Sequence, residues 1–142
     1  MDWKLELIVV PVSNVDRSKA FYSEKLGFNV DVDHAPNDEF RVVQLTPPGS
    51  ACSVTIGTGI SGGMPPGCMK GLHLVVADIV AAREQLVSRG VNVSEPVYYD
   101  MSGQQQPGLH PQRADYGTFL TLDDPDGNTW LVQEVQSRAK SA

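Results

Sequence analysis

Two stretches of the chain resemble each other: LIVVPVSNVDRSKAFYSEKLGFNV at residues 7–30 and GLHLVVADIVAAREQLVSRGVNV at residues 71–93. Each begins with an apolar run typical of a strand, continues with a helical pattern and ends shortly after a glycine. We expect Asn14 or Ser13 to cap the first helix and Asp78 the second, because these side chains accept hydrogen bonds from the free amides of a first turn. The chain therefore contains an internal repeat of strand and helix.

A second pair of segments extends the repeat. FRVVQLTPPGSACSVTIG begins at Phe40, and GTFLTLDDPDGNTWLVQE begins at Gly117. Pro and Gly turn residues between two β-rich runs predict a hairpin in each. The chain thus predicts a strand, a helix and about three strands, written twice, with a first module over about 5–57, a Gly- and Pro-rich linker over 58–70 and a second module over about 71–135.

Length and composition favour one globular domain over residues 1–142, ending in a polar tail at 136–142. The net charge of −6 argues against a nucleic-acid partner, since no basic surface is available for phosphates. No export signal or membrane span is visible, so we expect a soluble, cytoplasmic protein without a membrane partner. Cys52 and Cys68 have no spacing that indicates thiolate zinc binding.

The combination of Phe21–Tyr22, Leu-Gly-Phe at 26–28 and Asp-Pro-Asp-Gly-Asn at 124–128 resembles the vicinal oxygen chelate superfamily. This group holds the glyoxalases, the bleomycin resistance proteins and the extradiol dioxygenases, and the resemblance runs from Leu5 to Val135. It implies an α+β fold of two tandem βαβββ modules whose curved sheets surround a shared cavity, the glyoxalase/bleomycin resistance/dihydroxybiphenyl dioxygenase fold. It also implies a small-molecule ligand and a homodimer.

Enzymes of the superfamily usually hold one divalent metal by His, Gln or Glu side chains on four strands. Carried over to this sequence, those four positions fall on Leu7, Gly71, Leu131 and Val54, with Ser53 or Thr55 in place of Val54 if the turn is aligned differently. None of these positions supplies a carboxylate or an imidazole, and a divalent ion needs three or four converging oxygen or nitrogen donors. We therefore expect no bound metal and no other cofactor.

His73 and Gln133 are the leading polar candidates, because each lies two residues beyond a vacated ligand position and so shares its face of a strand. We expect His73 to be buried on a central strand, where it acts as a catalytic group or is simply a satisfied core histidine. Gln133 is suited to anchor a ligand or to pair with His73. A displaced metal site would need a third ligand such as Gln44 or Glu6, and Gln44 is itself a candidate for substrate binding.

The segment Tyr98–Tyr116 reads as a long loop that either lines the site or forms a surface insertion. If it folds over the cavity, Arg113 is placed to clamp a substrate carboxylate, with Tyr116 beside it. The alternative is a solvated surface. Trp3 and Phe40 are candidates for aromatic walls, although such residues more often fill a core or an interface.

Three functions remain open. The first is a metal-independent small-molecule protein, enzyme or binder, with an apolar cavity anchored by His73 and Gln133. The second is a protein that sequesters a cationic aromatic drug without turnover, suggested by the acidic charge. The third is a glyoxalase I-like lyase or extradiol dioxygenase that uses displaced metal ligands. The residues do not decide whether there is turnover.

Overall fold

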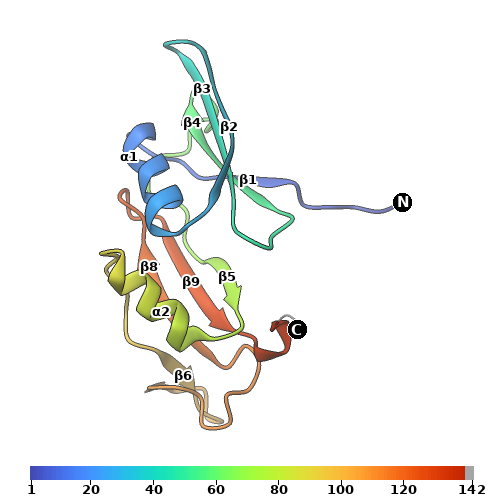
Figure 1. The fold of residues 1–142 in the computed structure, drawn as a ribbon, viewed down its shortest axis with the longest axis vertical. Coiled ribbons are helices and arrows are strands. Elements are labelled where there is room, and N and C mark those ends of the chain that lie inside the picture. Colours follow the sequence, from blue (N-terminus) through green and yellow to red (C-terminus); the bar gives the residue numbers. More distant parts are fainter. Residues whose placement is uncertain (140–142) are drawn as a thin grey trace. The chain divides into compact units, whose positions relative to one another are not determined.

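The computed structural model describes residues 1–139, which divide into two compact units. The first unit holds Met1–Lys70 together with Asp124–Asn128, and the second holds Gly71–Asp123 and the chain from Thr129 on. The order of helices and strands is nearly the same in both (Figure 1).

The first unit contains β1 (Leu7–Val9), α1 (Val15–Ala20), the π-helical turn η1 (Phe21–Lys25), β2 (Asn29–Asn37), β3 (Phe40–Thr46) and β4 (Ser53–Thr58). Its four strands form one sheet in the order β1-β4-β3-β2. β1 runs parallel to β4, whereas the other pairs are antiparallel. The predicted hairpin that begins at Phe40 is confirmed as β3 and β4.

The second unit contains β5 (Leu72–Val76), α2 (Ile79–Ser88), β6 (Val97–Tyr99), β7 (Gln105–Pro107), β8 (Thr118–Asp123), β9 (Thr129–Glu134) and the 3-10 turn η2 (Gln136–Arg138). Its five-stranded sheet has the order β5-β9-β8-β6-β7 and again contains one parallel pair, β5 with β9. Without β7, this order repeats that of the first sheet strand for strand. The predicted repeat and the α+β class are therefore confirmed.

The predicted helix caps are present in both units. The side chain of Asn14 accepts a hydrogen bond from the Arg17 amide at 3.0 Å, and the Asp78 side chain accepts from two amides of the first turn of α2 at 3.0 and 3.1 Å. Gly27 and Gly90 follow the helices with φ of 76° and 79°. Only glycine adopts this left-handed conformation without strain, which explains why each helix ends there.

The π-helical turn explains why the first copy of the repeat is one residue longer than the second. A π turn accommodates one extra residue within a helix, and here the amide of Leu26 bonds to the carbonyl of Phe21, five residues back, at 3.1 Å. α2 has no such turn. The insertion leaves Tyr22 fully buried.

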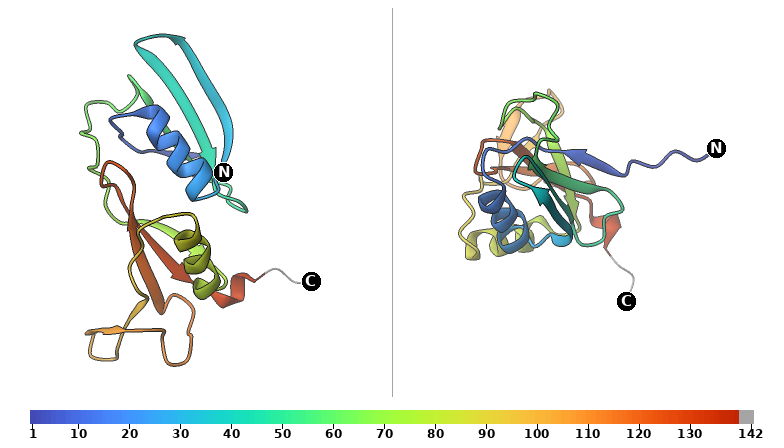
Figure 2. Two further views of the ribbon diagram at one scale, coloured as in Figure 1. Left: turned by 60° about the vertical axis from the view of Figure 1, so that its left-hand side comes forward. Right: turned by 90° about the horizontal axis from the view of Figure 1, so that it is seen from above.

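Each helix covers one face of its own sheet (Figure 2). In the first unit the core between helix and sheet is formed by apolar side chains, including Val10, Phe21, Tyr22, Val43, Leu45, Val54 and Ile56. In the second it is formed by Leu72, Ile79, Leu86, Leu120, Leu122, Trp130 and Val132. Because strand side chains alternate between faces, the other face of each sheet displays a separate set of residues.

The interpretation of Tyr98–Tyr116 as one long loop is wrong for its first half. β6 and β7 form an antiparallel hairpin in which Tyr99 pairs with Gln105. The turn is closed by Asp100, whose side chain accepts hydrogen bonds from the amides of Ser102 and Gln104 at 2.9 and 3.0 Å. An Asp followed by Ser and Gly is a turn signal, and it marks this hairpin in the sequence.

The Asp-Pro-Asp-Gly-Asn turn between β8 and β9 packs with the first unit. The carboxylate of Asp124 accepts hydrogen bonds from the Tyr22 hydroxyl and the Asn128 side-chain amide, both at 2.7 Å. Asn128 also donates to the Pro11 carbonyl at 2.9 Å and accepts from the Met69 amide at 3.0 Å. The turn is therefore a buried polar cluster that stabilises the fold.

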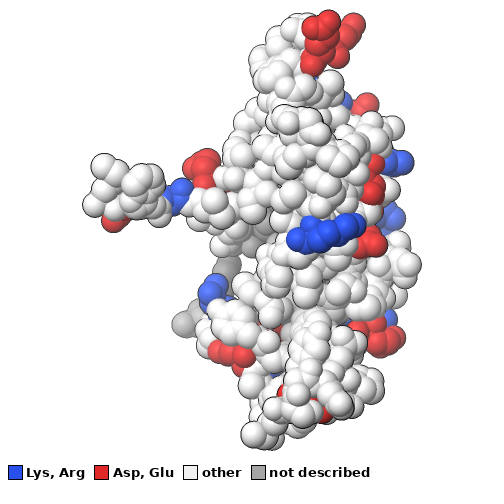
Figure 3. All heavy atoms as spheres, turned by 180° about the vertical axis from the view of Figure 1, so that it is seen from behind, with Lys and Arg blue, Asp and Glu red and all other residues white. Residues whose placement is uncertain are grey.

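No helix in residues 1–139 is long and apolar enough to cross a membrane. Among the described residues on the face shown in Figure 3, Lys and Arg atoms are few and scattered over mostly uncharged surface. Of the predicted polar tail, 136–138 form η2, and residues 140–142 lie outside the described part of the chain.

Candidate functional site

The candidate site is the face of the second sheet opposite α2, which we call the open face. Burial alternates along β9, where Trp130, Val132 and Glu134 are buried and the residues between them are only half-buried. Strand pairing extends the same alternation to β5, β8 and β6. The open face is formed by His73, Val75, Val97, Tyr99, Phe119, Thr121, Asp123, Thr129, Leu131 and Gln133.

His73 lies on β5, opposite Leu131 of β9. The prediction that it is buried on a central strand is wrong, because β5 is the edge strand of the sheet and the His73 side chain is exposed. Its Nδ1 contacts the Gly71 carbonyl, which only accepts hydrogen bonds, so Nδ1 carries the proton. The neutral ring therefore presents the lone pair of Nε2 as an acceptor.

Gln133 lies on β9 between Phe119 of β8 and Val75 of β5. Its side-chain amide makes no hydrogen bond to another residue in the described part of the chain, His73 included. The amide therefore keeps both donors and its acceptor available at the open face. Its predicted role as a ligand anchor stays a prediction.

Apolar and aromatic side chains surround these two polar groups. The rings of Tyr99 and Phe119 lie 5.3 Å apart at an angle of 30°. Tyr99 is 52% exposed and Val75 is 39% exposed, although both lie on strands. Exposed apolar side chains grouped on one face are typical of a binding surface.

The four positions that hold a metal in related enzymes are unsuited to one here. Leu131 lies on the open face, Gly71 precedes β5, Leu7 lies on β1 and Val54 is buried in β4. Leu7, Val54, Gly71 and Leu131 carry no side-chain donor atom, and the alternatives to Val54, Ser53 and Thr55, offer only a hydroxyl, so the residues present do not fit the family's usual metal site. Among residues 1–139, no group of three or more His, Cys, Asp or Glu side chains is placed to hold a metal ion.

The second half of the loop is held by an ion pair between Arg113 and Glu134. The Nε of Arg113 donates to Glu134 at 2.7 Å, a second guanidinium nitrogen donates to the other carboxylate oxygen, and the Ile79 amide donates to Glu134 at 3.0 Å. The Arg113 guanidinium holds the pKa of this fully buried carboxyl below its usual range, against burial, which raises it. Glu134 in turn raises the pKa of Arg113.

Sequence reasoning missed Glu134. The signal was present, because a buried acid at the end of an apolar strand requires a partner. The guanidinium of Arg113, predicted to clamp a substrate carboxylate, here binds this internal carboxylate, and its role toward a ligand stays a prediction. Tyr116 is exposed, and its amide donates to the Glu134 carbonyl at 2.8 Å.

The remaining candidates lie in the first unit. Gln44 of β3 donates to the Ser53 hydroxyl at 3.2 Å and is half-buried. Trp3 is 89% exposed ahead of β1, and Phe40 is 38% exposed at the start of β3. Their predicted contacts with a ligand stay predictions, as does the shared cavity.

The sequence matches the Glyoxalase/Bleomycin resistance protein/Dioxygenase superfamily over residues 4–132. The chain belongs to this superfamily. The match spans both units of the fold, so the resemblance that the sequence motifs indicated is confirmed.

Individual members of the superfamily agree with the fold. TnmS3, described as an antibiotic binding protein from Streptomyces sp. CB03234, is 30% identical, with a TM-score of 0.73 over 94% of this chain and 97% of its own. A superfamily member from Sphaerobacter thermophilus DSM 20745 is 27% identical, with a TM-score of 0.70 over 94% of this chain and 98% of its own. The uncharacterised protein YetH of Bacillus subtilis strain 168 is 27% identical over 89% of this chain and 94% of YetH.

Proposed function

We propose that the chain binds a small organic molecule on the open face, without a metal ion. The observation that carries the proposal is the pairing of exposed apolar side chains with two polar groups, the Nε2 of His73 and the amide of Gln133. The strand spacing and rise place the backbones of these two residues roughly 8 Å apart. A ligand of a few rings with polar atoms at its edges matches this arrangement.

Apolar contact supplies most of the expected affinity. Burying roughly 300 Å² of apolar surface, counted on ligand and protein together, yields about 7 kcal/mol before the entropic cost of association. A hydrogen bond to Gln133 adds about 1 kcal/mol and selects among ligands of similar shape. Before the cost of association these contributions sum to about 8 kcal/mol, which corresponds to a dissociation constant of about 1 μM, so this is the tightest binding that we expect.

We infer binding without turnover, as in sequestration of a drug. His73 is the imidazole of the open face, and Glu134, at the end of the neighbouring strand β9, points to the opposite face and is paired with Arg113. The acid that strand alternation places on the open face, Asp123, ends β8, two strands away from His73, and its carboxylate accepts a hydrogen bond from the Thr129 hydroxyl at 2.9 Å. Among the described residues of this face, His73 therefore has no acid on the neighbouring strand to form an acid and base pair with it. The antibiotic binding ascribed to TnmS3 favours the same inference.

The test is a calorimetric titration of metal-free protein with metal-free bleomycin and a panel of aromatic antibiotics. We expect saturable binding to at least one compound, no tighter than about 1 μM and unchanged by a chelator. Gln133→Leu should weaken it about fivefold through loss of one hydrogen bond. Gln85→Leu on the exposed side of α2 is the matched control and should leave it unchanged. Binding that requires added Ni, Zn, Fe or Mn contradicts the proposal and favours the displaced metal site.

We also propose a homodimer in the cytoplasm. The exposed apolar residues include Met1, Trp3 and Leu5, which alternate along the segment before β1 and offer surface to a second copy. Each chain has a mass of 15.4 kDa, so sedimentation equilibrium at micromolar concentration should give twice that mass. A single-chain mass at all concentrations contradicts the dimer.

A further inference from the structure

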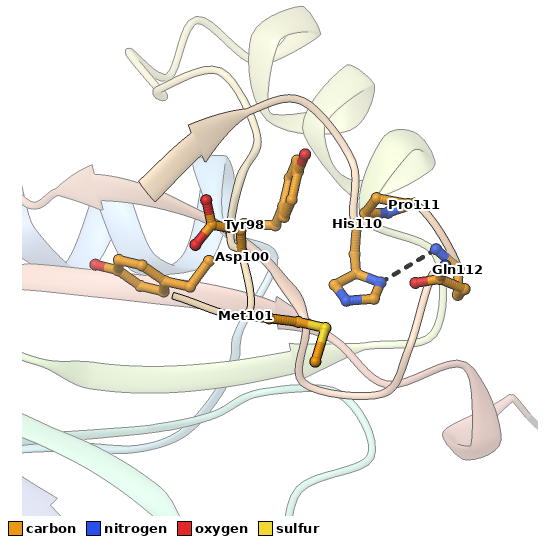
Figure 4. A pocket seen from close by; sticks show the side chains of 7 residues that line it. Tyr98, Asp100, Met101, His110, Pro111 and Gln112 are labelled. Carbon is orange, nitrogen blue, oxygen red and sulfur yellow. Dashed lines mark hydrogen bonds between the residues drawn. The ribbon is translucent and has the colours of Figure 1, made fainter. Parts of the chain in front are cut away.

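A cavity of about 410 Å³ lies at the end of β6, between the β6–β7 turn and the loop that follows β7. Figure 4 shows its lining, formed by Tyr98, Tyr99, Asp100, Met101, His110, Pro111 and Gln112. The volume falls within the range of small-molecule sites. All of these residues belong to the second unit, and apart from Tyr99, which also lies on the open face, the function proposed above uses none of them.

The walls are mainly aromatic and apolar. The Tyr98 and His110 rings lie 5.8 Å apart in an edge-to-face arrangement at 74°. Met101 is fully exposed at the rim of the cavity. Its flexible thioether is suited to cover the face of a bound ring, since sulfur contacts aromatic rings favourably.

His110 presents a hydrogen-bond donor. Its Nδ1 accepts from the Gln112 amide at 3.2 Å and from the Ala114 amide at 3.4 Å, so the neutral ring carries its proton on Nε2. No described residue accepts a hydrogen bond from that nitrogen. The first of the two bonds is the dashed line in Figure 4, and it fixes the ring with Nε2 free for a ligand atom.

The charge at the cavity is negative. Hydrogen bonds from the Ser102 hydroxyl, the Gln104 amide and the Gln106 side chain lower the pKa of Asp100 to about 2, so this carboxyl is ionised at neutral pH. The other lining residues carry no positive charge. Aromatic faces together with a carboxylate attract a cation and disfavour an anion.

We propose that this cavity binds a flat aromatic cation, whose ring lies against Tyr98 and Met101 and whose positive charge lies near Asp100. An oxygen or nitrogen acceptor at the edge of the ligand takes the hydrogen bond from His110. The site does not include His73 or Gln133, so it gives the second unit a second ligand-binding site, which prefers aromatic cations.

Proflavine is a suitable probe because it is a flat cation at neutral pH, and acridine has the same ring system without the charge. We expect fluorescence titration to show proflavine binding at least fivefold tighter than acridine. Met101→Ala should weaken both dyes about threefold through the lost sulfur contact. Asp100→Asn should weaken proflavine about threefold and leave acridine unchanged.

Two substitutions of exposed residues provide matched controls. Glu84→Gln on α2 removes a charge away from the cavity, and Met64→Ala removes a methionine from the first unit. Both should leave proflavine binding unchanged. The inference is overturned if the two dyes bind equally, or if the controls weaken proflavine as much as Asp100→Asn and Met101→Ala.

Gln133→Leu separates this site from the one on the open face. Proflavine affinity unchanged in Gln133→Leu and reduced in Met101→Ala supports the cavity, whatever the outcome for the antibiotics. Proflavine affinity that is reduced in Gln133→Leu and unchanged in Met101→Ala places the dye on the open face. That result overturns the inference and leaves the proposed function intact. Because Met101 is fully exposed, its replacement leaves the fold unchanged, which circular dichroism checks.

Discussion

Removing one oxygen atom from Tyr22 should destabilise the protein measurably. The Tyr22 hydroxyl donates to Asp124 at 2.7 Å, and the tyrosine is fully buried. Its ring packs edge-to-face on Phe21, with centroids 5.2 Å apart, and it is stacked on Phe28 at 5.8 Å. Phenylalanine keeps these ring contacts, so Tyr22→Phe reports on the hydroxyl.

The expected loss follows from the charge of the acceptor. A hydrogen bond to a charged group contributes about 1.5–3 kcal/mol, and Asp124 keeps three other donors: the Asp126 amide and two groups of Asn128. We therefore expect the free energy of unfolding to fall by about 2 kcal/mol. With an unfolding entropy of roughly 0.3 kcal/mol/K for a chain of this length, the melting temperature should fall by about 7 °C.

Urea denaturation followed by circular dichroism measures the change, with Tyr99→Phe as the control. Tyr99 is 52% exposed, and its hydroxyl makes no hydrogen bond to another described residue, so its removal should change the unfolding free energy by less than about 0.5 kcal/mol. If Tyr22→Phe is as stable as Tyr99→Phe, the buried cluster around Asp124 does not stabilise the fold as we argue.

The remaining predictions concern the ion pair between Arg113 and Glu134 and the close approach of Gly67 to the Asp126 carbonyl oxygen. Arg113→Met should lower the unfolding free energy at neutral pH by about 2 kcal/mol in urea denaturation, because it leaves the buried Glu134 carboxylate without its main partner. An unchanged urea midpoint contradicts a stabilising role for this ion pair. The folded-state pKa of Glu134 is lowered, so its stabilisation is complete above its ordinary pKa and is lost as the pH falls through the lowered value. The unfolding free energy, measured from about pH 6 down to about pH 3, should therefore fall less steeply in Glu134→Gln than in the natural sequence. If it falls equally steeply in both, the pKa of Glu134 is not lowered in the folded protein. Gly67→Ala places a Cβ 2.1 Å from the Asp126 carbonyl oxygen, whereas Gly49→Ala, at a similar φ, meets nothing within 4 Å. Thermal melts should show Gly67→Ala to be the less stable by more than about 1 kcal/mol, and equal melting temperatures contradict the close approach.

The elements that local sequence signals specify were predicted well. Asn14 and Asp78 marked the helix starts, and Gly27 and Gly90 marked their ends, because capping and left-handed φ depend on neighbouring residues alone. The repeat then gave the topology, since two similar segments fold alike.

The candidate site was predicted less well, because it depends on contacts distant in sequence. His73 was expected on a central strand, yet sheet order rather than local pattern decides that β5 lies at the edge. Glu134 and Arg113 are 21 residues apart, and neither residue indicates its partner. The hairpin after Tyr98 was missed although Asp100 carried a turn signal.

The most direct test of small-molecule binding on the open face is NMR mapping of metal-free protein. The backbone amides are followed during titration with the antibiotic that binds most tightly in calorimetry. We expect saturable shifts centred on His73, Leu131 and Gln133, unchanged by a chelator. Shifts that avoid these residues, or that appear only after a divalent metal is added, contradict metal-free binding on the open face.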